Sequence, residues 1–293
     1  MPLSEEFLSE FASRCLDALD APMRDALAAA AAPPTLWGSG CSGTDSPTWA
    51  FRALHAALRS IGATSSFEHV FSAEHDWAKR LFLQEVANPQ YLFSDVFDLS
   101  ASRSEDLVSG GLVDPLGALA VDIFVAGFVC KSVSRLNSDA ARAATAIWNE
   151  MTQTGSTLKA VILYCERLRP KVVILENVLG LTRNRQHIHI CTRFRQLGYV
   201  AMVQVTSPAL FGWPQDRPRL YFIIVRLDVL TQAGIATGEF ERFVSDLHGR
   251  MASTQSEIAI DDVLYQEDHP FLVRKRAEEK RNKKEQERKE HAR

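Results

Sequence analysis

The chain has 293 residues, of which 46% are hydrophobic and 24% are charged, as in an ordinary globular protein. No apolar run approaches the roughly 20 residues of a membrane span, and the acidic N-terminus does not resemble a secretory signal. Residues 274–293 carry ten Lys or Arg and five Asp or Glu, a net charge of +5. Because the whole chain has a net charge of −3, the remaining residues carry −8, which excludes a generally basic nucleic-acid-binding surface.

The cysteines are widely spaced and include no Cys-x-x-Cys pair; they are Cys15, Cys41, Cys130, Cys165 and Cys191. This spacing argues against a disulfide framework or a zinc site and favours a reducing compartment. We therefore expect no metal centre, no membrane association and no secretion. The protein would be nuclear in a eukaryote and cytoplasmic otherwise.

Residues 4–32 are predicted to be helical, because apolar side chains recur at helical spacing until Pro33-Pro34 ends the run. The patterns that follow divide the rest of the chain. The expected parts are an N-terminal helical segment over 1–34, a catalytic α/β domain over 35–227, a short C-terminal extension over 228–273 and a charged tail over 274–293.

A glycine-rich turn follows a short strand at Thr35-Leu36-Trp37 and precedes a helix predicted over 47–58. The spacing Gly38-x-Gly40-x-x-Gly43 matches the dinucleotide-binding fingerprint. Backbone N–H groups at such a helix start can approach a nucleotide-like ligand closely. The alternative is a tight turn that needs glycine for its backbone conformation alone.

The next strand, predicted over 67–73, ends at Glu74, where a carboxylate can accept hydrogen bonds from ribose hydroxyls. A solvated acidic residue is the alternative. A helix over 77–86 follows. Tyr91-Leu92-Phe93 leads to Asp95-Val96-Phe97-Asp98, predicted as a third strand end with an acidic residue, and 99–117 are predicted to be loop.

A buried strand over 122–126 breaks at Gly127 into a loop that holds Cys130. A thiol at the carboxyl end of a parallel strand lies where open α/β sheets bind ligands. The neighbouring Lys131 would favour the nucleophilic thiolate. The alternative is a small hydrophobic side chain that ends a core strand.

A polar stretch over 138–157 is predicted to be a mobile loop over the site, and a helix over 157–168 follows it. The apolar strand over 172–175 ends in Glu176-Asn177-Val178, with apolar residues at every position as in parallel strands covered on both faces. If this strand and the preceding one are parallel, Glu176 lies on the same sheet edge as Cys130.

After a helix over 188–197, strands over 199–206 and 220–225 are predicted to form an antiparallel hairpin. Arg217 and Arg219 lie two residues apart near a strand start, so both point the same way and could brace an anion or a polarised carbonyl. Surface arginines without such a role are the alternative. A helix over 228–248, a short element over 256–264 and a solvated tail complete the chain. The predicted fold class is α/β, a doubly wound, mostly parallel sheet with a C-terminal antiparallel hairpin.

Four of these segments together resemble, in linear order over residues 35–227, the cytosine-5 DNA methyltransferase family. They are Gly40-Cys41-Ser42-Gly43, similar to the family's cofactor turn; Gly127 to Ser134, similar to its Pro-Cys-Gln nucleophile loop; Glu176-Asn177-Val178, identical to its Glu-Asn-Val motif; and Gln215-Asp216-Arg217-Pro218-Arg219, a match to its Gln-x-Arg-x-Arg motif. Val129 and Lys131 stand where the family has proline and glutamine, and Ser42 stands where it has glycine.

The resemblance implies a Rossmann-like methyltransferase that uses S-adenosyl-L-methionine and acts on a cytosine flipped out of DNA. Cys130 would add to carbon 6 of the base, Glu176 would hydrogen-bond its ring nitrogen and exocyclic amine, and Arg217, supported by Arg219, would stabilise the adduct. The implied cofactor contacts are Gly40, Cys41, Ser42, Gly43, Glu74 and Asp95.

The family's target recognition region is not recognisable after residue 227, so a partner chain or a missing segment is expected to supply it. An RNA (tRNA) cytosine-5 methyltransferase, or a non-catalytic homologue that binds cofactor or nucleic acid, are therefore alternatives. A nicotinamide dehydrogenase would account for Gly38, Gly40 and Gly43, but leaves Cys130 and Glu176 without a role.

Overall fold

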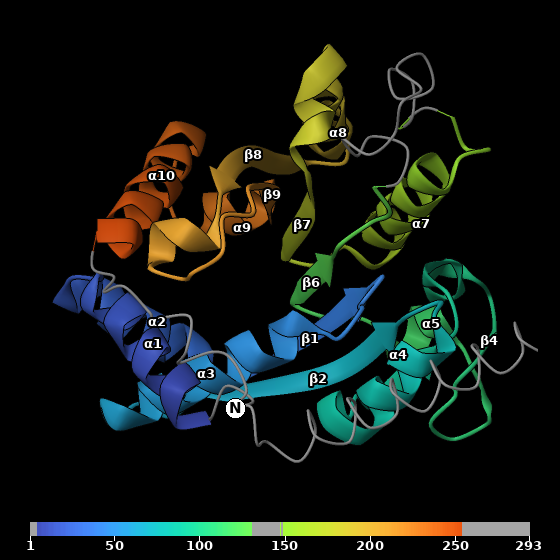
Figure 1. The fold of residues 1–293 in the computed structure, drawn as a ribbon, viewed down its shortest axis with the longest axis horizontal. Helices are drawn as coiled ribbons and strands as arrows, with labels where there is room; N and C mark the ends of the chain where they lie inside the picture. The colour runs from blue at the N-terminus through green and yellow to red at the C-terminus, as the bar shows by residue number, and fades with distance from the viewer. Residues whose placement is uncertain (1–4, 131–146, 148, 254–293) are drawn as a thin grey trace, which may run out of the picture.

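In the computed structural model, which describes residues 5–130, 147 and 149–253, the fold is built on a seven-stranded sheet (Figure 1). The strand order is β3-β2-β1-β6-β7-β9-β8. The strands are β1 (Pro34–Gly40), β2 (Ser66–Ala73), β3 (Tyr91–Phe93), β6 (Ile123–Ala126), β7 (Val172–Val178), β8 (Tyr199–Thr206) and β9 (Arg219–Arg226). Strands β3, β2, β1, β6 and β7 are parallel, and β9 pairs antiparallel with both β7 and β8. The predicted fold class is confirmed.

Strands β1, β6 and β7 end at the same edge of the sheet. Gly40 pairs with Ala126, and Ala126 pairs with Leu175. Gly127 and Glu176, which come directly after these positions, therefore lie at the same carboxyl edge, as the sequence predicted. In open α/β sheets ligands bind at this edge.

Helices cover both faces of the sheet. They are α1 (Glu5–Asp17), α2 (Ala21–Ala31), α3 (Ser46–Ser60), α4 (Trp77–Phe82), α5 (Pro115–Ala118), α7 (Gln153–Leu168), α8 (Gln186–Gln196), α9 (Leu227–Gln232) and α10 (Thr237–Ser253). Short π and 3₁₀ turns are η1 (Leu83–Ala87), η2 (Val96–Ser100), η3 (Leu179–Arg185) and η4 (Pro208–Phe211). In Figure 1, α1, α2 and α3 gather at one end of the molecule with α10 beside them.

The stretch predicted to be helical over 4–32 is helical in its described part, where it is divided into the two helices α1 and α2. Asp20 begins α2 by accepting a hydrogen bond from the Met23 N–H at 3.0 Å, and a proline lies in the first turn. A side chain that satisfies a free N–H group favours a new helix start at that position. Similarly, the helix predicted over 228–248 is divided into α9 and α10.

The third strand is confirmed as β3 at Tyr91–Phe93, but residues 95–98 start the 3₁₀ turn η2 instead of ending that strand. Asp95 accepts a hydrogen bond from the Phe97 N–H at 3.2 Å, and Asp98 accepts one from the Asp95 N–H at 3.0 Å. This reciprocal capping favours a helical turn over an extended strand.

Several predicted boundaries differ from those in the structure. The helix over 77–86 becomes α4 followed by η1, and the loop over 99–117 contains the hairpin of β4 (Ser104–Glu105) and β5 (Leu112–Val113) and the start of α5. Strand β1 extends to Gly40, and α7 starts at Gln153, within the stretch predicted to be mobile. The rest of that stretch up to 146, the element over 256–264 and the tail over 274–293 lie outside the described residues.

Gly38 lies within β1 rather than in a turn, and packing explains why glycine is there. A Cβ atom at this position would lie 2.3 Å from Cε1 of the Phe71 ring. Phe71 is fully buried, with its ring centroid 6.0 Å from that of Phe124 and 5.5 Å from that of Tyr164. The absence of a side chain at Gly38 therefore leaves room for the buried Phe71 ring to pack against β1.

We expect Gly38→Ala to lower the free energy of unfolding by about 1–3 kcal/mol, because the Phe71 ring cannot move without displacing its buried neighbours. Thermal or urea unfolding measures this loss. The matched control is Gly249→Ala in α10, where an added Cβ meets nothing within 4 Å and alanine should stabilise the helix by up to about 1 kcal/mol. Equal stability of the two variants would contradict the packing argument.

Candidate functional site

A cavity of about 450 Å³ opens at the carboxyl edge of the sheet. Its wall includes Cys41 and Gly43 from the turn after β1, Glu74 from the end of β2 and Asp95 from the start of η2. Four of the six predicted cofactor contacts therefore meet in one cavity. Gly127 and Val129, from the loop that leads to Cys130, also line it.

Glu74 is 7% exposed and is held by two backbone N–H groups. Its Oε2 accepts from Gly43 at 2.6 Å, and its Oε1 accepts from Asp76 at 2.9 Å. Each carboxylate oxygen has a second lone pair, so the fixed carboxylate can still accept hydrogen bonds from a ligand. This arrangement suits a pair of neighbouring hydroxyl groups.

The Asp95 carboxylate lies at the start of η2, with its Oδ2 3.2 Å from Nδ1 of His75. His75 and Phe97 also line the cavity, and the Phe97 side chain is 43% exposed. An exposed ring beside a carboxylate can hold a flat heterocycle by stacking while the carboxylate accepts a polar hydrogen. The sequence indicated Asp95, but gave no sign that His75 or Phe97 would lie beside it.

Gly40 and Ser42 are not among the residues that line this cavity. A Cβ atom on Gly40 would lie 3.0 Å from the Phe124 ring. The Ser42 hydroxyl accepts from the Ala73 N–H at 3.1 Å and lies 2.7 Å from the Ser39 hydroxyl. Ser42 N also donates to the Ala73 carbonyl at 3.0 Å. Ser42 thus fastens the turn to β2 instead of facing the cavity.

Asp45 makes a second attachment of this turn to β2. It is buried, has a left-handed backbone with φ of 54°, and its Oδ2 accepts from the hydroxyls of Thr48 at 3.1 Å and Ser72 at 3.2 Å. The same oxygen lies 3.3 Å from His69 Nε2. Burial raises the pKa of Asp45 to about 6 and lowers that of His69 to about 4. At neutral pH an ionised carboxylate therefore faces a neutral imidazole, which the sequence did not predict.

The loop that leads to Cys130 is held by two side chains. Asn177 Nδ2 donates to the Phe128 carbonyl at 2.9 Å, and Val129 N donates to the Thr157 hydroxyl at 3.3 Å. Cys130 itself is half-buried and packs against the main hydrophobic core. Cys130 therefore follows directly after Val129, which lines the cavity. Lys131 lies outside the described residues.

Glu176 lies in β7 beside the same loop. Its Oε2 is 3.6 Å from the place where a Cβ on Gly127 would be, and its Oε1 is 3.0 Å from Nε of Arg219. Burial raises the pKa of Glu176 and outweighs the opposite effects of Arg219 and Arg217. The carboxyl group is thus easier to protonate than an exposed glutamate, although its side chain is 34% exposed.

The two arginines take different positions. Arg219 starts β9 opposite Val178, at the edge where β7 ends, and contacts Glu176. The Arg217 backbone N–H donates to the Ser207 hydroxyl at 2.9 Å, and that hydroxyl donates to Asp216 at 2.9 Å. The backbone of Arg217 is therefore fixed while its side chain is exposed. The structure brings both cations to the edge that holds Glu176 and the Cys130 loop.

Comparison with known proteins gives a matching family and several relatives. The model of the C-5 cytosine-specific DNA methylase family matches residues 52–292, a range that starts after the glycine turn. The chain is 31% identical over 185 residues to the DNA (cytosine-5-)-methyltransferase DMT5 of Cryptococcus neoformans, covering 62% of this chain and 7% of that protein. It is 33% identical over 113 residues to the type II methyltransferase M.NgoFVII of Neisseria gonorrhoeae, covering 36% of this chain and 27% of that protein.

Solved structures include similar folds at low identity. The crystal structure of the S. pombe Dnmt2 methyltransferase aligns with a TM-score of 0.43 and 12% identity, over 66% of this chain and 50% of that one. The chain spans about a tenth or less of the length of the fungal relatives DMT5.

Within the described residues, no helix is long and apolar enough to cross a membrane, and no group of three or more His, Cys, Asp or Glu could hold a metal ion.

Proposed function

Since this chain belongs to the C-5 cytosine-specific DNA methylase family, we propose that it transfers a methyl group from S-adenosyl-L-methionine to carbon 5 of cytosine in DNA. One observation carries the proposal. Gly127 lines the cavity and lies beside the Glu176 carboxylate, three residues before Cys130. A cofactor in the cavity and a base beside Glu176 would therefore meet at the thiol.

The cavity wall fits the cofactor. Glu74 would accept hydrogen bonds from the ribose hydroxyls, while Asp95 and Phe97 would contact the adenine. Cys41 and Gly43 would lie along the ligand from the turn side, and Gly40 and Ser42 would act from behind by holding that turn. Bound there, S-adenosyl-L-methionine would supply an electrophilic methyl group.

The protein's own side chains would prepare the base. The Cys130 thiolate would form a bond to carbon 6 of cytosine, which makes carbon 5 nucleophilic. Once carbon 5 carries the methyl group, loss of its proton to solvent would expel the thiolate from carbon 6 and restore the ring. Glu176, whose pKa is raised by burial, would donate to the ring nitrogen and accept from the exocyclic amine. Arg219 would hold Glu176 in place, and the exposed Arg217 would stabilise the negative charge of the adduct.

The assignment of DNA as the substrate is supported by the family and by the names of the relatives. RNA is the alternative polymer. A non-catalytic relative would not require the cavity, the thiol loop and Glu176 to meet at one edge. We also propose that residues 35–227 form the catalytic unit and that another segment or a partner chain supplies target recognition. In a eukaryote the protein would act in the nucleus.

We expect the protein to transfer a tritiated methyl group from S-adenosyl-L-methionine to cytosine-containing duplex DNA, and much less to RNA of the same sequence. Calorimetry should show binding of the cofactor but not of NADH. Cofactor binding with methylation of RNA alone would favour the RNA alternative. Cofactor binding without transfer to either polymer, in the presence of a range of target sequences, would favour a non-catalytic role.

A further inference from the structure

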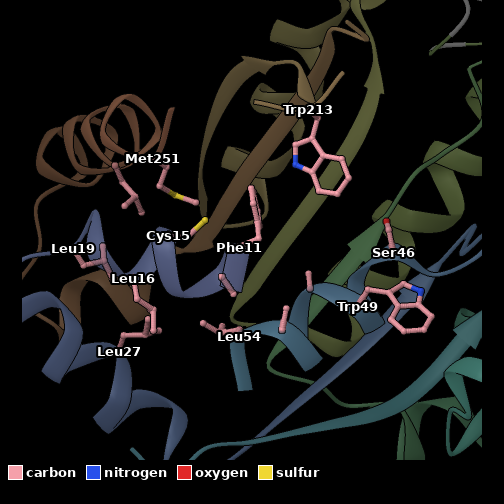
Figure 2. A pocket seen from close by; sticks show the side chains of 14 residues that line it. Phe11, Cys15, Leu16, Leu19, Leu27, Ser46, Trp49, Leu54, Trp213 and Met251 are labelled. Carbon is pink, nitrogen blue, oxygen red and sulfur yellow. The ribbon is translucent and has the colours of Figure 1, made fainter. Parts of the chain in front are cut away.

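A second cavity, of about 710 Å³, lies away from the proposed active site, between α1, α2, α3 and α10 (Figure 2). Its lining is almost entirely apolar. Phe11, Cys15, Trp49, Trp213 and Met251 form much of the wall, and Ser46 supplies the one hydroxyl among the lining residues. A solvent-open groove of this size and composition is unfavourable unless something covers it.

The last described helix leads the chain to this groove. Leu247 and Met251 of α10 are part of its wall, and α10 ends at Ser253. Arg250, in the same turn, holds α10 against the α1–α2 junction, with its Nη1 3.9 Å from Asp20 Oδ2. The chain therefore continues from the edge of the groove, with 40 further residues to residue 293.

The sequence beyond Ser253 contains a segment that fits an apolar groove. Residues 256–264 read Ser-Glu-Ile-Ala-Ile-Asp-Asp-Val-Leu, with Ile260, Val263 and Leu264 at a spacing that gives an amphipathic helix one apolar side. Seven residues from Ser253 to Ile260 reach up to about 24 Å when extended. This reach is enough for the segment to turn back onto the helix it follows.

The segment also carries the acidic residues Glu257, Asp261 and Asp262 between its apolar residues. The arginines Arg24 and Arg250 on the helices that form the groove pair with Asp17 and Asp20, so the apolar residues of the segment, and not its charges, make it fit the groove. We propose that residues 256–264 of the same chain dock into the groove between α1, α2, α3 and α10, with their aliphatic side chains against Phe11, Cys15 and Trp213. The docked segment would then rest beside the turn that leads to Arg217.

Cys15 provides a natural probe, because its thiol lines the groove. The full-length Ile260→Cys variant would be oxidised under mild conditions, and the disulfides mapped by mass spectrometry. We expect a disulfide within one chain between Cys15 and the thiol introduced at position 260. The matched control is Asn282→Cys, in the charged tail. Equal cross-linking of Cys15 in both variants, or a link between two chains, would overturn the proposal, the latter because it identifies a second copy as the occupant.

A second measurement does not depend on a cross-link. Burial already raises the pKa of Cys15 to about 11, so the unaltered chain should react slowly with N-ethylmaleimide. We expect Ile260→Asp to raise the labelling rate of Cys15 by about tenfold, the factor that loss of one buried aliphatic side chain produces in a docking equilibrium. Ala277→Asp in the tail should leave the rate unchanged. If Ile260→Asp labels no faster than the unaltered chain, the segment does not cover the groove, whatever the methylation assay shows.

Discussion

Replacing Cys130 with alanine is expected to reduce methyl transfer by at least about 10³-fold, because burial raises the pKa of Cys41, the other thiol at the cavity, to about 12 and keeps it protonated. Affinity for S-adenosyl-L-methionine should change little, since Val129 and Gly127 line the cavity and Cys130 lies one residue beyond. The fold should also persist, because the half-buried side chain loses one sulfur atom. Single-turnover methylation and calorimetry on the same preparation separate these effects.

Cys191→Ala is the matched control. Cys191 is buried in α8 and is not among the residues that line the cavity. Its loss should lower stability modestly and leave methyl transfer within about twofold. If Cys130→Ala retained activity close to that of Cys191→Ala, the thiol at 130 would be a packing residue, which is the alternative that the sequence left open.

Glu176→Gln is expected to reduce methyl transfer by about 10²–10³-fold, with cofactor affinity preserved. The amide keeps the shape of the side chain and can hydrogen-bond the base, but it cannot supply a proton to the ring nitrogen. The contact with Arg219, 3.0 Å in the unaltered protein, would change from an ion pair to a neutral hydrogen bond. An undiminished rate would show that proton donation from this position is not needed.

The same variant should be at least as stable as the unaltered protein at neutral pH. Folding raises the pKa of Glu176 above its ordinary 4.5, so the unfolded chain releases the proton more readily than the folded one. Stability of the unaltered protein is therefore lost as pH rises through the interval above 4.5. Glutamine removes this loss, so the two proteins should be equally stable at lower pH. Partial exposure keeps the difference small, and urea unfolding across the pH range measures it.

The sequence predicted the sheet well because its strands are short apolar runs between clear turn residues. Glu74 and Gly127 follow such strands, and Glu176 follows the apolar run within β7. The carboxyl ends of parallel strands meet at one edge, so the convergence of these residues could be predicted without coordinates. Family membership was also predictable, since four short motifs occur in a fixed order, and the family match confirms it.

Other features depend on contacts that sequence patterns do not encode. Gly38 was predicted in a turn, but it lies in β1, where the absence of a Cβ atom leaves room for the Phe71 ring of the neighbouring strand. The Ser42 hydroxyl accepts a hydrogen bond from Ala73 of β2, which no local pattern in the sequence indicates. The buried Asp45–His69 pair joins residues 24 positions apart, and neither belongs to a recognisable motif. Such contacts join residues that are far apart in the sequence, so the spacing of neighbouring residues cannot predict them.

The proposed mechanism depends on a covalent bond between Cys130 and a cytosine. The most direct measurement is to incubate the full chain with S-adenosyl-L-methionine and duplex DNA that contains 5-fluorocytosine, which stops the reaction at the adduct. We predict a denaturation-resistant complex that mass spectrometry maps to Cys130 and that Cys130→Ala does not form. A methylating protein that forms no such complex, or forms it through another cysteine, would contradict the account.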